Sequence, residues 1–189
     1  MTAMPAVKLM TAEEFMALAP REDSARVELI EGEVVVSQPA WLHQRTCVRL
    51  LFAFEAWTRA AKGRGAVSLP LDVLLDEHNV FVPDILWYDA ASTPGRDDRP
   101  PYSVPALAVE VRSPSTWRCD IGAKKAVYER RGLRELWLVD TAADVILVFR
   151  PSAAESHGFD QSLELGGGDS LTSPLLPGFT LTLDEVFAN

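Results

Sequence analysis

Apolar and polar residues alternate along the chain with two different periods. Segment 41–62 places apolar residues at mixed three- and four-residue intervals, which predicts an amphipathic helix. Segment 119–131 predicts a second helix, ended by Gly132. Shorter helices are expected over 11–19 and 182–187, because each segment opens with a Thr-x-x-Glu capping box.

Between these helices the pattern is typical of strands. Segment 26–37 predicts two short strands around Gly32. Segment 106–111 is nearly all apolar, as in a central strand covered on both faces. Further single strands are predicted over 66–75, 80–88, 135–140 and 144–150.

These elements predict an α/β (or α+β) fold. The expected architecture is a mixed central sheet flanked by helices, mainly antiparallel, with a parallel element around helix 119–131. We expect one domain over residues 1–189, with the two short terminal helices as additions.

Composition and charge limit the partners. The chain has 189 residues, 48% hydrophobic and 24% charged, as in an ordinary globular protein. Its net charge of −9 lacks the basic surplus with which proteins bind nucleic acid tightly without metal ions. Cys47 and Cys119 lack CxxC spacing, and no apolar run approaches the roughly 20 residues of a membrane span. Without a secretion signal at its start, the chain is expected to be cytoplasmic, with no membrane partner.

Two carboxylates interrupt apolar segments. Asp84 follows Pro83 within a predicted strand, and Glu110 lies near the end of segment 106–111. A buried carboxylate without a partner is costly, and two neighbouring ones raise each other's pKa. A divalent cation would remove both problems. Two acids and a backbone carbonyl are ligands typical of Mg²⁺ or Mn²⁺. The carbonyl of Val111, next to Glu110, is well placed to be that backbone ligand.

Cations follow these acids along the chain. Asp120, Lys124 and Tyr128 lie four residues apart, on one stripe of the predicted helix. Arg112 is expected on the same strand face as Glu110. A cation beside such a metal can orient the attacking water or stabilise a phosphate transition state.

Each residue also has an ordinary structural explanation. Asp84 would then be an edge feature of a strand, and Glu110 would pair with Arg112 or Arg118. Lys124 would be a solvated helix residue, as most lysines are.

The order of these motifs resembles a known family. Pro83-Asp84, Glu110 and a following lysine are similar to the PD-(D/E)XK nuclease pattern. More narrowly, Glu110 followed by Ser-Pro-Ser-Thr at 113–116, then Asp, Lys and Tyr spaced by four, resembles the Uma-type family of restriction endonuclease-like proteins. The segments VELIEGEVV, VPDILWY and LLPGFTL also fit that family, so the resemblance covers nearly the whole chain.

The resemblance implies roles for particular residues. Arg112 stands where the general nuclease pattern has lysine, and in the resembling family a helix lysine takes over that role, which Lys124 fits. Arg112 is then a phosphate contact or a clamp on Glu110, since arginine stays charged and binds two oxygens at once. The resemblance also offers Glu28 as a third carboxylate, while His43 is a candidate base or a plain N-terminal residue of its helix.

The sequence therefore predicts a Mg²⁺-dependent nuclease that hydrolyses DNA phosphodiester bonds. Two alternatives stay open, an inactive nuclease-fold protein that binds nucleic acid or a protein partner, and a metal-dependent hydrolase of another phosphorylated substrate. A homodimer is expected, because nuclease folds of this size often pair to cut two strands and two-fold dimers are the commonest oligomers.

Overall fold

The computed structural model describes residues 9–18, 26–153, 156 and 158–188. Its centre is a six-stranded sheet with the order β10-β9-β8-β7-β6-β3. β7 and β8 are parallel, and the other neighbouring pairs in this sheet are antiparallel. The strands of this sheet are β3 (Ala66–Ser68), β6 (Ile85–Tyr88), β7 (Leu107–Val111), β8 (Glu135–Asp140), β9 (Val145–Arg150) and β10 (Gln161–Leu165).

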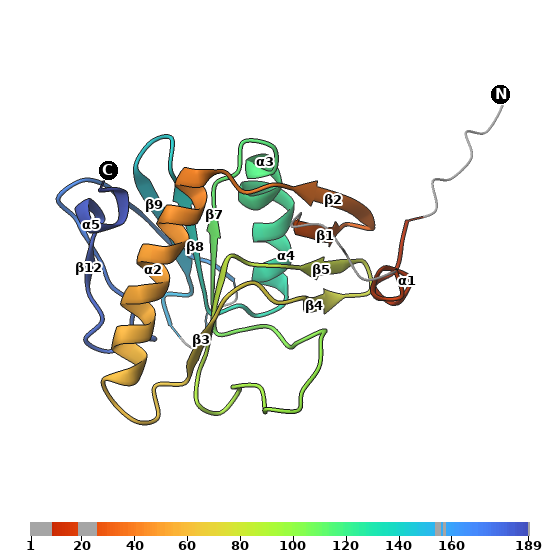
Figure 1. Cartoon of the computed structure of the whole chain (residues 1–189), viewed down its shortest axis with the longest axis horizontal. Coiled ribbons are helices and arrows are strands. Elements are labelled where there is room, and N and C mark those ends of the chain that lie inside the picture. Colours follow the sequence, from red (N-terminus) through yellow and green to blue (C-terminus); the bar gives the residue numbers. More distant parts are fainter. Residues whose placement is uncertain (1–8, 19–25, 154–155, 157, 189) are drawn as a thin grey trace.

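Helices cover both faces of the central sheet, so the predicted mixed α/β architecture is confirmed (Figure 1). The long helix α2 (Trp41–Arg59) packs Leu50 and Phe54 against one face. On the other face lies the crossover between β7 and β8, which packs Val127 and Tyr128 against the sheet. This crossover comprises α3 (Trp117–Cys119), the π-helical turn η1 (Asp120–Lys124) and α4 (Lys125–Arg130).

A second, four-stranded sheet has the order β2-β1-β5-β4 and lies on the α4 side of the central sheet (Figure 1). Its Val73, Leu75 and Phe81 join the same buried cluster as Tyr128 and Leu138. The strands are β1 (Arg26–Ile30), β2 (Glu33–Ser37), β4 (Val73–Asp76) and β5 (Asn79–Phe81).

The terminal helices form as expected where the structure describes them. The helix predicted over 11–19 is α1 (Ala12–Met16), and position 19 lies outside the described residues. The helix predicted over 182–187 is α5 (Leu183–Phe187), preceded by the small β11 (Ser170–Leu171) and β12 (Leu181–Thr182) pair. Both helices have complete capping boxes, from Thr11 and Thr182. In the described ranges no helix is long and apolar enough to cross a bilayer.

Two predicted strands were wrong in extent. Segment 66–75 is two strands, β3 and β4, which belong to different sheets, and segment 80–88 is likewise divided into β5 and β6. Each break contains a proline, Pro70 or Pro83, which has no N–H to donate to a strand ladder. The chain therefore crosses between the sheets at both places, and the second crossing carries Asp84.

Candidate metal centre

Asp84 and Glu110 meet because β6 begins where β7 ends. The Asp84 N–H donates to the Val109 carbonyl at 3.0 Å, and its carboxylate Oδ2 accepts the Val111 N–H at 2.7 Å. Along β7, alternate residues point to opposite faces, so Val109 and Val111 join the α2 core while Glu110 points toward α4. Both acids are buried, with 3% and 1% of their surfaces exposed.

Lys124 reaches Glu110 from the π-helical turn. Its Nζ lies 2.7 Å from Glu110 Oε1, 2.8 Å from Glu28 Oε1 and 3.4 Å from Asp120 Oδ1. The Tyr128 hydroxyl donates to the same Glu110 oxygen at 2.8 Å. Lys124 is only 1% exposed. A π turn often occurs at a functional site, and here it carries both Asp120 and Lys124 into the cluster.

Arg26, at the start of β1, links the two predicted metal ligands. Its guanidinium donates to Asp84 Oδ1 at 2.5 Å and to Glu110 Oε2 at 2.8 Å. Its Nε also lies 3.7 Å from Glu28 Oε2. One planar cation is thus held by carboxylates from two neighbouring strand ends.

The cations of this cluster remain protonated. Burial alone would lower the pKa of Lys124, but Glu110, Glu28 and Asp120 outweigh it and raise that pKa. Burial likewise opposes the charge on Arg26, and the nearby acids, Asp84 first, hold its pKa above the ordinary value.

The acids differ among themselves. Burial raises the pKa of Glu110 to about 7, against the opposing effects of Lys124 and Arg26. Burial would also raise the pKa values of Asp84 and Glu28, but the cations beside them prevail and lower both. Glu110 is therefore only partly ionised at neutral pH unless a further cation binds beside it, whereas Asp84 and Glu28 are ionised.

His43 extends the cluster on the α2 side. Its Nε2 lies 3.3 Å from Asp84 Oδ1, and its Nδ1 lies 3.7 Å from the Cys47 Sγ. Burial raises the pKa of the Cys47 thiol above its ordinary range, so the thiol is neutral. The imidazole thus bridges Cys47 and Asp84. One potential ligand atom from each of these three buried residues lies within 4.8 Å of the others, so they form a second group that could hold a metal ion.

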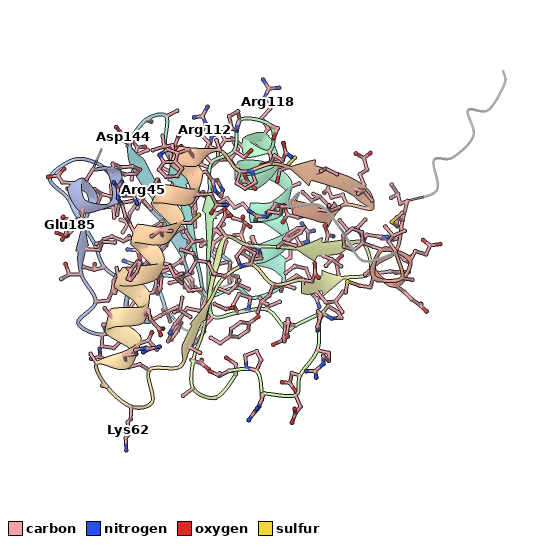
Figure 2. All side chains as sticks on the ribbon, in the orientation of Figure 1. Arg45, Lys62, Arg112, Arg118, Asp144 and Glu185 are labelled. Atoms are coloured by element: carbon pink, nitrogen blue, oxygen red, sulfur yellow. The ribbon has the colours of Figure 1, made fainter. Side chains whose placement is uncertain are left out.

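The cluster opens into a pocket of about 580 Å³. Asp84, Glu110 and Val111 line it, whereas Arg112 pairs with Asp140 at 2.8 Å at the neighbouring strand end. Figure 2 shows Arg118 pointing outward from α3, so neither arginine is the partner of Glu110. Among the described residues, the ionisable groups of the lining are Arg26, His43, Cys47, Tyr102 and the acids Glu28, Asp72, Asp84, Glu110 and Asp120.

These residues fit a hard divalent cation. Asp84 and Glu110 each bond a different nitrogen of the same guanidinium, so both carboxylates face one cationic group. In an extended strand the N–H and carbonyl of a residue point to the same edge, so the Val111 carbonyl leaves β7 on the side of Asp84. Carboxylate and carbonyl oxygens of this kind are ligands for Mg²⁺ or Mn²⁺.

The structure gathers most of the residues that the sequence singled out. Glu28, His43, Asp84, Glu110, Val111, Asp120, Lys124 and Tyr128 lie in one cluster, and Arg112 lies beside it. Arg26 was missed. The sequence feature that could have identified it is its spacing of two residues from Glu28, because residues two apart in a strand share one face.

Comparison with known proteins agrees with this fold. A crystal structure described as "a putative nuclease belonging to DUF820" from Anabaena variabilis superposes with a TM-score of 0.77 at 17% identity, and the match covers 94% of this chain and 97% of that one. At this identity the likeness shows the fold alone. No curated protein matches significantly. The model of the Uma2 family, described as "Putative restriction endonuclease", matches residues 12–184, and the chain therefore belongs to the Uma2 family.

Proposed function

We propose that the chain is a Mg²⁺- or Mn²⁺-dependent nuclease that hydrolyses DNA phosphodiester bonds in this pocket. The main support for this proposal is that Asp84 and Glu110 both bind one cationic group, the guanidinium of Arg26, beside a pocket whose lining is rich in acids. Such a lining repels a phosphodiester until a cation is added. The description of the family supports a nuclease, and the metal and the substrate are part of the proposal.

Asp84, Glu110 and the Val111 carbonyl would hold the metal. When bound, Mg²⁺ supplies a Lewis acid for the phosphate and an acidified water. The chain itself fixes the ligands, because Val111 N–H and His43 orient Asp84 while the Tyr128 hydroxyl orients Glu110. Lys124, held as an ammonium ion, cannot accept a proton. It contacts Glu110 from outside the lining of the pocket, so its role would be to stabilise negative charge on the phosphate by the field of its own charge.

The first test uses the unaltered protein. Calorimetric titration with Mn²⁺ should show binding, and cleavage of double-stranded DNA should require Mg²⁺ or Mn²⁺. Ca²⁺ should bind without supporting cleavage well, since its longer and looser coordination aims the water poorly. Single-stranded DNA and RNA serve as comparison substrates. Metal binding without cleavage of any of them would favour a binding protein or a hydrolase of another phosphorylated substrate, and no binding at millimolar Mn²⁺ would refute the metal centre.

Arg26 should compete with the metal for its ligands. The guanidinium is bonded to one oxygen of each acid, so a metal must share or displace it. We expect Arg26→Gln to bind Mn²⁺ at least about tenfold more tightly in calorimetry, which corresponds to about 1.4 kcal/mol.

Arg112→Gln is the matched control for this change. Arg112 is bonded to Asp140, so its loss should leave Mn²⁺ affinity unchanged while weakening DNA binding. Equal Mn²⁺ affinities for the Arg26→Gln protein and the unaltered protein would show that the clamp on Asp84 and Glu110 does not oppose the metal.

A further inference from the structure

The outer face of α2 carries an unusual row of exposed side chains. Trp41, Val48 and Phe52 lie on this regular helix of 19 residues and are 81%, 40% and 72% exposed, which is high for large apolar side chains. Isolated exposed apolar residues are normal, but here they share one face. With the charged residues between and after them, they form a row that we call the α2 seam: Trp41, Arg45, Val48, Phe52, Glu55 and Arg59.

The α2 seam has the spacing of a coiled coil. Successive members are four, three, four, three and four residues apart, which is the heptad repeat with which two helices pack along a seam. The opposite side of α2 is the one that packs on the central sheet, through residues such as Leu50, Phe54 and Trp57. The seam therefore contributes nothing to the core of its own chain. Figure 1 shows α2 on the outside of the molecule, and Figure 2 labels Arg45 on it.

The seam is complementary to itself when reversed. Two antiparallel copies centred on position 50 place Val48 opposite Phe52 of the second copy. The same register places Arg45 opposite Glu55, an acid and a base. It also places Trp41 opposite Arg59, where a guanidinium can stack on the indole. Each pair occurs twice, as two-fold symmetry requires.

We propose that the α2 seam is the interface of a homodimer, in which α2 pairs antiparallel with α2 of a second copy. A second copy is the occupant because one seam supplies both members of every pair in the same register. Within the chain, Arg59 already contacts Glu55 at 2.5 Å, and Arg45 lies 6.0 Å from the Trp41 ring. Each end of the seam thus carries a small cluster, Trp41 with Arg45 at one end and Glu55 with Arg59 at the other. In the antiparallel dimer, the first cluster of one copy faces the second cluster of the other copy.

The pairing would also fix two pockets relative to each other. α2 carries the seam on one side and presents His43 to the pocket on the other. The dimer does not depend on catalysis, since the seam residues are outside the lining of the pocket. A protein without nuclease activity would still form this dimer.

A charge swap tests the register. Arg45→Glu places two glutamates opposite Glu55 residues, and Glu55→Arg places two arginines opposite Arg45 residues. Each variant alone should therefore be monomeric by light scattering at about 50 µM, a concentration at which we expect the unaltered chain to be dimeric. Mixed in equal amounts, the two variants should form a heterodimer, because both cross-pairs are then acid with base. A monomeric unaltered chain, a dimeric single variant, or a mixture that stays monomeric would each overturn the proposal.

Replacing an apolar residue at the centre of the seam tests the apolar contact there. Val48→Ser should weaken the dimer at least about tenfold, because the apolar contact with Phe52 is lost. Leu74→Ser is the matched control, since Leu74 on β4 is 41% exposed against 40% for Val48 and lies outside the seam. Equal effects of the two substitutions would place the interface elsewhere and refute the proposal.

Discussion

Replacing Asp84 with asparagine, or Glu110 with glutamine, is expected to abolish Mn²⁺ binding and DNA cleavage together. Each change removes one charged oxygen ligand while keeping the size of the side chain. Substitution of groups that only support a metal ligand already costs about 10–100-fold in affinity, so losing a ligand should weaken Mn²⁺ binding by at least about a hundredfold. Calorimetric titration and a cleavage assay on the same preparations measure both effects.

Glu135→Gln is the control for these two variants. Glu135 is fully buried in the same sheet, where it accepts from the Trp137 indole and the Ser173 hydroxyl at 2.7 Å each. It lies among the residues that face α2, away from Glu110. Metal binding and cleavage should survive in this variant. Full Mn²⁺ affinity in Asp84→Asn or in Glu110→Gln would show that the carboxylate replaced in that variant is not a ligand.

Removing the charge of Lys124 should affect both stability and catalysis. Its ammonium contacts three buried carboxylates, and breaking a buried ion pair from one side costs about 3–5 kcal/mol. Lys124→Met keeps the apolar stem but leaves those acids without this partner. We expect a loss of that size in urea unfolding without metal, partly recovered with Mn²⁺. At saturating metal, cleavage should be slower by about a hundredfold or more, as for other preorganised charge-stabilising groups.

Lys125→Met provides the neighbouring comparison. Lys125 makes a long 3.9 Å contact with Glu129 and lies over the rings of Phe149 and Phe159, with no buried carboxylate as partner. Its loss should therefore cost only about 1–2 kcal/mol, less than that of Lys124, and leave cleavage intact. If Lys124→Met were as stable and as active as Lys125→Met, the buried ammonium would have no electrostatic role.

Local patterns predicted the elements of this fold well where one period continued without interruption. The helical period of 41–62 gave α2, and the apolar run at 106–111 gave the central strand β7. The pattern failed at 66–75 and 80–88, because apolar residues continue through both turns although the chain changes sheets there. Pro70 and Pro83 marked the breaks, but apolar burial on both sides concealed them.

The site was predictable to the extent that charge interrupts apolar sequence. Asp84, Glu110 and Lys124 stood out because a buried charge needs a partner. Arg26 did not stand out, since an arginine at the start of a strand is usually solvated. Only the folded arrangement, which brings β1 beside the crossing at Asp84, shows which acids it contacts.

If the proposed metal centre is correct, the guanidinium of Arg26 allows the chain to fold before it binds the metal. Four buried acids, Glu28, Asp84, Glu110 and Asp120, surround two cations of the chain, Arg26 and Lys124, so much of the repulsion among them is relieved before any metal arrives. A newly made chain can thus reach its folded state in a cell where free metal is scarce, unlike proteins whose metal ion is part of their folding free energy. A metal bound at the proposed centre would then exchange with an internal counter-ion instead of nucleating the structure. In the Arg26→Gln protein this order is lost, and the same metal would become a folding ligand.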